Sequence, residues 1–183
     1  INPFILQMSI MMITKPPYAD APEYYHQYFD LLPENNLLEA LKNSMQLTLQ
    51  QMQSLDKQMY VYAYAPGKWT IAEVYQHIID CERILCYRAF RFSRFDDTPL
   101  AGFDEDHYIE ASRSYPLEVE KLSTHYSILR QQTILLFESM NNDMLNYKGT
   151  ANQLQMNARG IGFMLAGHNI HHCNVISERY LNK

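Results

Sequence analysis

The sequence predicts an all-α protein, a four-helix bundle with a long crossover between the second and third long helices. Four stretches have apolar residues at steps of three and four, and no run alternates as a strand would. The length of 183 residues is near that of one domain, without a shift in composition that suggests a second. We expect the bundle in residues 34–183 and an irregular arm in residues 1–33.

The arm is predicted from its prolines. Residues 14–33 hold four of them, at positions 16, 17, 22 and 33, so we expect an irregular segment that packs its tyrosines on the bundle and forms no helix. The apolar start lacks a basic region and a cleavage site, which argues against a signal peptide. Because the chain starts with Ile1 and has methionines at 8, 11 and 12, we expect its first several residues to be non-native and exclude them from the fold prediction.

The first two long helices have clear boundaries. One begins at Asn36 and ends near Ser54 to Lys57, and a connection with the turn signal Pro66-Gly67 follows. The second opens with a capping box, Thr70 followed by Glu73, and runs to about Arg94. One stripe of this second helix holds Thr70, Val74, His77, Cys81, Ile84 and Arg88.

The crossover and the last two helices follow. A loop over 96–102 leads to a short helix over 103–110, and Pro116 suits the first turn of a third long helix that reaches about Met140. This link of some twenty residues is long enough to cross the end of a bundle. A polar loop then leads to Asn157, a plausible cap for the fourth helix. The second and fourth helices can therefore be neighbours.

The fourth helix carries three of the seven histidines within five residues. His168 and His172 are one turn apart on one stripe, a spacing that lets two imidazoles reach one metal ion. His77 lies in the apolar stripe of the second helix, and facing helices of a bundle are where metal sites are built. Ordinary core histidines would give the same pattern, so the spacing alone leaves both interpretations open.

Other polar residues are assigned to the surface. His107 and His125 are expected there. The acids at positions 104–106 are either carboxylates behind a metal-binding histidine or, as we favour, cap and surface residues.

Composition excludes some function classes. The formal charge of -5 and pI near 5.8 argue against a nucleic-acid partner, and no segment indicates a membrane protein. Cys81, Cys86 and Cys173 form no CxxC pair, which fits a reducing cytoplasm and neither disulfides nor a cysteine zinc site.

Four segments together resemble the DinB superfamily: KWTIAEVYQHIIDCER at 68–83, YRAFR at 87–91, PLAGFDED at 99–106 and AGHNIHH at 166–172. The resemblance spans residues 36–181. It implies a four-helix bundle with a three-histidine site for a divalent metal ion, formed here by His77, His168 and His172. Zinc and nickel are the metal ions we favour, although cobalt and iron(II) also accept imidazole ligands. The neighbouring His171 receives no role.

The resemblance also ranks the functions. The family includes transferases and isomerases that use bacillithiol, mycothiol or glutathione, as well as proteins described as metal-dependent hydrolases. Three imidazoles leave a tetrahedral ion one open position, as in catalytic sites. We therefore place a thiol-dependent S-transferase first, with a small-molecule substrate and a low-molecular-weight thiol. A metal-dependent hydrolase comes second, and a non-catalytic metal-binding bundle or interaction module third.

Two features would separate these functions. A carboxylate within hydrogen-bond reach of the open position would favour hydrolysis, and a roomy polar pocket beside it would favour a thiol cosubstrate. The sequence shows neither, and it assigns no catalytic residue. A homodimer is expected because small bundles often bury one helical face against a symmetric partner.

Overall fold

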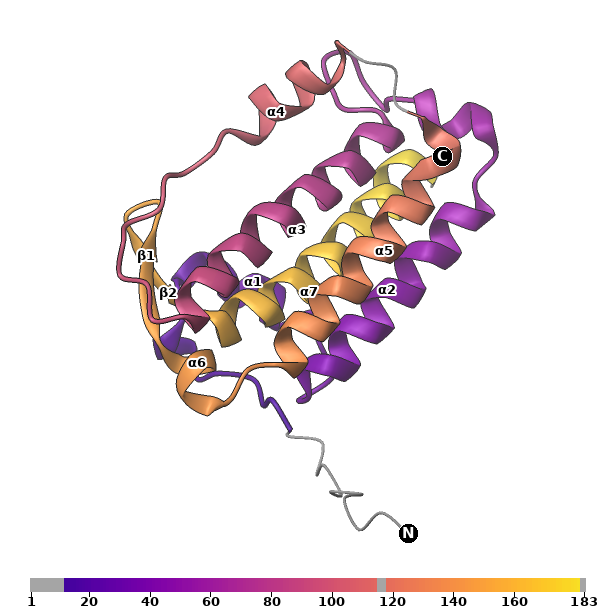
Figure 1. The fold of residues 1–183 in the computed structure, drawn as a ribbon. Coiled ribbons are helices and arrows are strands. Elements are labelled where there is room, and N and C mark those ends of the chain that lie inside the picture. Colours follow the sequence, from indigo (N-terminus) through magenta and orange to yellow (C-terminus); the bar gives the residue numbers. More distant parts are fainter. Residues whose placement is uncertain (1–11, 115–117, 182–183) are drawn as a thin grey trace, which may run out of the picture.

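Four long helices form the bundle in the computed structural model, which describes residues 12–114 and 118–181 (Figure 1). They are α2 (Leu37–Ser54), α3 (Ile71–Ser93), α5 (Val119–Glu138) and α7 (Ala158–Val175). Helices α3 and α2 each pack against both α5 and α7. The predicted four-helix bundle is confirmed, and the two histidine helices α3 and α7 are neighbours.

Capping side chains explain where three of these helices begin, and two of the caps, Thr70 and Asn157, were predicted. The Asn36 side chain accepts a hydrogen bond from the amide of Leu38. Thr70 and Glu73 form the complete capping box, and Asn157 accepts from the amide of Gly160 at 2.8 Å. Each cap satisfies an amide that the first helical turn leaves without a partner. The predicted role of Pro116 lies outside the described residues.

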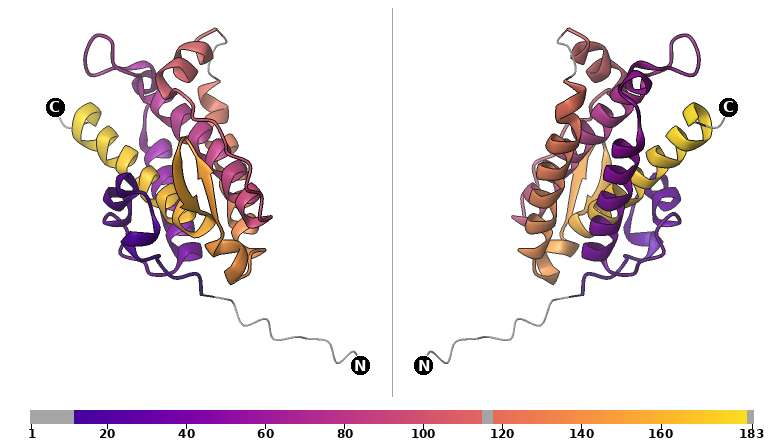
Figure 2. Two further views of the ribbon diagram at one scale, coloured as in Figure 1. Left: turned by 90° about the vertical axis from the view of Figure 1, so that its left-hand side faces the viewer. Right: turned by 90° about the vertical axis from the view of Figure 1, so that its right-hand side faces the viewer.

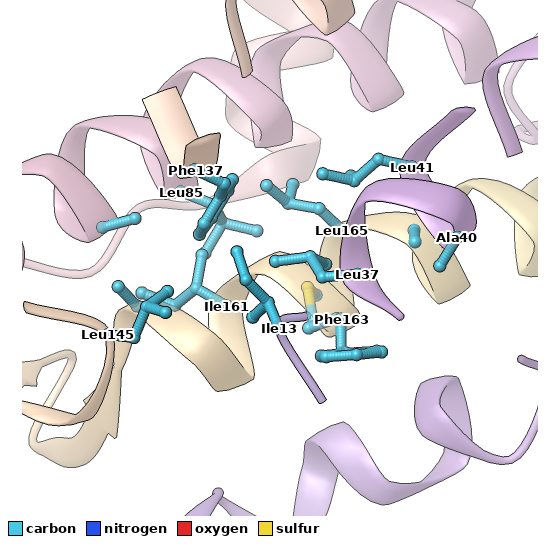
Figure 3. Close-up of a cluster of buried hydrophobic side chains, with 14 of the residues drawn as sticks. Ile13, Leu37, Ala40, Leu41, Leu85, Phe137, Leu145, Ile161, Phe163 and Leu165 are labelled. Carbon is cyan, nitrogen blue, oxygen red and sulfur yellow. The ribbon is translucent and has the colours of Figure 1, made fainter. Parts of the chain in front are cut away.

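A polar layer divides the bundle core into two apolar clusters. One cluster contains the start of α2 and the ends of α3 and α5; Figure 3 shows part of it, with Leu37, Leu85 and Phe137 among its labelled side chains. The other cluster lies toward the opposite end and includes Ile78 and Tyr126. Between the two, buried polar side chains come from all four helices: Ser44, Glu82, Arg130, Thr133, His168 and Asn169.

The arm is not irregular throughout, so that prediction was wrong. A 3-10 turn (Tyr18–Asp20) and helix α1 (Glu23–Phe29) lie within it. Pro22 directly precedes α1 and therefore costs it no hydrogen bond. Helix α1 packs on α7 at Gly167, where a Cβ atom would lie 2.1 Å from the carbonyl oxygen of Tyr28. Glycine is needed for this close approach.

A β-hairpin replaces the predicted polar loop before α7, and the expectation of no strand was wrong. Helix α6 (Asn142–Asn146) leads into strands β1 (Lys148–Ala151) and β2 (Leu154–Asn157), which pair antiparallel. The two turn residues, Asn152 and Gln153, both have positive φ, as in the common two-residue hairpin turn. The hairpin escaped prediction because its turn holds no glycine.

The crossover from α3 to α5 runs along the outside of α3 and carries helix α4 (Glu105–Ser112) (Figures 1 and 2). The Asp104 side chain caps α4 by accepting from the amide of His107 at 2.9 Å. Leu100 donates its amide to Thr150 and accepts from the amide of Asn152, which ties the crossover to the hairpin. The predicted crossover and its short helix are confirmed, with the helix shifted two residues toward the C-terminus.

Two short segments complete the chain. A 3-10 segment (Lys57–Val61) lies between α2 and α3, and α7 continues as a π-helical segment (Ile176–Leu181). Within the described residues, no helix is both long and apolar enough to cross a membrane. The predicted homodimer stays a prediction that light scattering would test.

Candidate metal centre

Three histidines from two helices meet at the polar layer. The Nε2 atom of His168 lies 3.2 Å from that of His77 on α3 and 3.0 Å from that of His172, one turn further along α7. One ligand nitrogen from each ring lies within 4.8 Å of the others. His77 and His168 are buried and His172 is half-buried. The structure therefore brings together the three residues that the sequence singled out.

The spacing of these nitrogens fits a metal ion. In a tetrahedral zinc site with bonds of 2.0–2.1 Å, two ligands are about 3.3–3.4 Å apart. The two Nε2 contacts are close to that edge length. Within the described residues, the Nδ1 atoms of His168 and His172 are buried without a hydrogen-bond partner. Hydrogen bonds elsewhere therefore do not explain why these rings are buried together, whereas a shared cation at the Nε2 atoms would.

Burial keeps the three rings neutral, which is the form that binds metal. Burial lowers the pKa of His77 to about 4, although the nearby Asp106 acts in the opposite direction. Burial and the neighbouring imidazoles lower the pKa values of His168 and His172 well below the usual value. Near neutral pH the cluster thus offers three uncharged nitrogen ligands.

Aromatic side chains surround the triad. The ring of Trp69 lies 4.9 Å from that of His77, and Tyr28 of α1 presents an edge contact to His168 at 5.5 Å between ring centroids. His171 contacts the rings of Tyr28 and His172 but is not among the three converging ligands. Its pKa is lowered by burial and by Arg179. The triad is thus held on two sides by apolar rings.

A cavity of about 350 Å³ opens beside the triad. Helices α1, α3, α4 and α7 and the hairpin all contribute to its wall. The charged side chains on that wall are Arg88, Glu105 and Asp106. Sequence reasoning missed the contribution of the arm, whose tyrosines also line the cavity: Tyr24, Tyr25 and Tyr28.

The acids at 104–106 were predicted to be either cap and surface residues or carboxylates behind a metal-binding histidine, and the structure places them differently. Asp104 is a helix cap, as we favoured. Glu105 and Asp106 are exposed but line the cavity, and Asp106 is near enough to raise the pKa of His77 against the effect of burial. His107 and His125 are exposed, as predicted.

The fold and the histidine cluster define an all-α bundle with a candidate three-imidazole metal centre. Residues 40–176 match the profile of the DinB superfamily. Because this match covers most of the sequence, the chain belongs to that superfamily. A search of curated proteins finds no match.

Two solved structures share the fold. YfiT from Bacillus subtilis, described as a probable metal-dependent hydrolase with an unusual four-helix bundle topology, has a TM-score of 0.69 and 17% identity over 90% of each chain. A mycothiol-dependent maleylpyruvate isomerase has a TM-score of 0.65 and 15% identity over 80% of this chain and 61% of the isomerase. At such identities the likeness shows the fold alone.

Proposed function

We propose that the protein is a metal-dependent enzyme in which His77, His168 and His172 hold one divalent ion, with zinc and nickel as the first candidates. The observation that carries the proposal is the convergence of three neutral imidazoles at the wall of a cavity. A structural metal site uses all its positions for protein ligands, whereas a catalytic site keeps one open. An ion at this wall would make a bound thiol or water more acidic and therefore a better nucleophile.

Thiol-dependent S-transfer is the reaction we place first. A thiol cosubstrate and an electrophilic substrate must fit side by side, and a cavity of about 350 Å³ lined by tyrosines and charged groups offers that space. The structural relative that uses mycothiol is consistent with this reaction. Trp69 and Tyr28 would exclude water from the triad and fix the orientation of its rings.

Metal-dependent hydrolysis is the second candidate because of the acids on α4. Asp106 and Glu105 line the same cavity and could accept a proton from an attacking water. The description of YfiT as a probable hydrolase agrees with this alternative.

Metal analysis of alanine variants tests the ligand set. Replacing His77, His168 or His172 by Ala should remove most of the bound ion, because each change takes away one of three ligands. His171→Ala is the matched control, one position from a ligand on the same helix, and it should retain most of the metal. The variants should be prepared without a histidine tag. Metal loss in His171→Ala equal to that in His172→Ala would show that the ligand pair is wrongly assigned.

Turnover assays separate the functions. Metal-loaded protein is incubated with a panel of low-molecular-weight thiols and a chromogenic electrophile, and in parallel with esters and amides. S-transfer predicts turnover only in the first set, dependent on His77, His168 and His172. Turnover only in the second set would establish the hydrolase, and turnover in neither would favour the non-catalytic bundle.

A further inference from the structure

Arg88 on α3 is a buried cation for which the described residues provide no anion. The residue is 6% exposed and lines the cavity of the metal centre. Its Nη2 atom donates to the carbonyl oxygen of Ala101 at 2.9 Å, and its guanidinium lies over the ring of Phe103. In the described part of the chain, no carboxylate lies within ion-pair distance of it.

Arg88 also has guanidinium nitrogens without a partner in the described ranges, at the wall of the cavity. Among the described residues, Arg88 Nε and Nη1 have no hydrogen-bond partner, yet they do not belong to the polar atoms that are shut off from solvent. A guanidinium has five N–H donors, so one bond to Ala101 leaves a complete edge for a bidentate contact. Burying a cation is costly unless it is paired, and a ligand anion would remove that cost.

We propose that Arg88 binds a carboxylate of the cosubstrate or substrate whose reacting group lies at the histidine triad. This inference rests on the proposed function and adds a chemical class to it: the ligand carries a carboxylate at one end and its reacting atom at the other.

The spacing along α3 sets the length of this ligand. Residues 77 and 88 are eleven positions apart, which is three helical turns, so both side chains lie on one face with Cα atoms about 16 Å apart. The arginine side chain shortens the gap. The two groups of the ligand are therefore separated by several bonds, and a two-carbon spacer is too short.

The acids fix the direction in which such a ligand binds. Glu105 and Asp106 begin α4 and line the cavity, whereas Arg88 contacts Ala101 and Phe103 in the first part of the crossover. Glu105 and Asp106 disfavour a carboxylate beside them, and Arg88 attracts one to its own part of the wall. The cavity is thus polarised along α3.

Matched ligands test the proposal on the unmodified, metal-loaded protein. Calorimetry compares mercaptooctanoate with mercaptooctanamide, which differ only in the charge at the distal end. The carboxylate should bind at least about tenfold more tightly, because charge-assisted hydrogen bonds are stronger than neutral ones. Mercaptopropionate and its amide, which cannot span the cavity, should show no such difference.

Variants assign the preference to this residue. Arg88→Gln should abolish the difference between acid and amide, and Arg88→Lys should keep only part of it because lysine cannot form the bidentate contact. Arg83→Gln, an exposed arginine on the same helix, is the matched control and should keep all of it. Circular dichroism and metal content show whether each variant is folded.

Octanoate and octanamide, which lack the thiol, separate this inference from the proposed function. If the thiol adds no affinity but the acid still binds more tightly through Arg88, the carboxylate site stands and thiol binding at the triad does not. If acid and amide bind equally in the unmodified protein, the proposal is overturned even where Arg88→Gln fails to fold. An acid preference that persists in folded Arg88→Gln overturns it as well.

Discussion

Two polar clusters share the layer that divides the core, and they are built in opposite ways. Arg130 of α5 and Glu82 of α3 are fully buried and joined by two parallel hydrogen bonds of 2.7 and 2.9 Å. Arg130 also donates to Ser44 and to the carbonyl oxygen of Leu41, and Thr133 donates to Glu82. The rings of the histidine triad contact one another and Cys81, and among the described residues the Nδ1 atoms of His168 and His172 are buried without a hydrogen bond.

The difference is the one expected between a structural cluster and a candidate binding site. A buried polar network with every group satisfied holds its helices in one arrangement and offers nothing to a ligand. A cluster that buries nitrogens without hydrogen-bond partners is costly unless a bound ligand compensates for that cost. The two clusters also interact, since the positive charge of Arg130 contributes to the low pKa of His168 after burial and the neighbouring histidines.

Breaking the ion pair should have the largest effect on folding. Burial opposes the charge on Arg130, but Glu82 outweighs it and raises the pKa of that guanidinium. Arg130→Met leaves the Glu82 carboxylate buried without its cation, so the free energy of unfolding should fall by about 3–5 kcal/mol in urea denaturation.

The double variant Glu82→Leu, Arg130→Met is the control for this change. It removes both charges and should recover most of the loss, because replacing a buried pair by apolar residues is often neutral. Equal stability of the single variant and the unmodified protein would show that the pair contributes little to the layer.

The sequence predicted the helical frame because local signals specify it. Thr70 with Glu73, Asn36 and Asn157 each marked a helix start that the structure confirms. The histidines were also found by a local signal, the step of four on α7. The fold then placed His77 beside them, as expected for facing helices.

What the sequence could not predict depends on partners far apart in the chain. Glu82 and Arg130 are 48 positions apart, and no periodicity pairs them. The cavity is likewise closed by elements from the arm, the crossover and the hairpin. Helix α1 did have a signal: Tyr25, Tyr28 and Phe29 are spaced as one helical face between flanking prolines.

Lowering the pH should destabilise the fold through the histidine triad, in contrast to the Glu82–Arg130 ion pair. In the unfolded chain a histidine takes up a proton near pH 6.5, but in the folded chain His77 does so only near pH 4. Above pH 6.5 the residue is neutral in both states. Between pH 6.5 and pH 4 only the unfolded chain binds the proton, so the free energy of unfolding decreases as the pH falls through this range. For His77 the loss amounts to roughly 3 kcal/mol.

Chemical unfolding of chelator-treated protein between pH 7 and 4 measures this loss. His77→Gln should flatten the profile because it removes one titrating group, and added divalent ion should shift the fall to lower pH because protons must then displace the ion. A profile for His77→Gln as steep as that of the unmodified protein would show that other groups cause the acid sensitivity.

The substitution Gly167→Ala should disturb the surroundings of the histidine triad and leave the Glu82–Arg130 ion pair intact. Alanine is the better helix former by about 1 kcal/mol, so a Gly→Ala change inside α7 would by propensity alone be stabilising. At Gly167, however, the new Cβ atom would lie 2.1 Å from the carbonyl oxygen of Tyr28, and backbone cannot rotate away as a side chain can. Helix α1 must shift, at a net cost of about 1–3 kcal/mol.

Gly160→Ala is the matched control on the same helix. There the Cβ atom would be no closer than 3.3 Å to its neighbours, so the free energy of unfolding should change by no more than about 1 kcal/mol. Because Tyr28 contacts His168 and lines the cavity, Gly167→Ala should also weaken ligand binding beside the triad. Urea denaturation and calorimetry of the two variants measure both effects, and equal behaviour of Gly167→Ala and Gly160→Ala would show that α1 does not form the wall of the site.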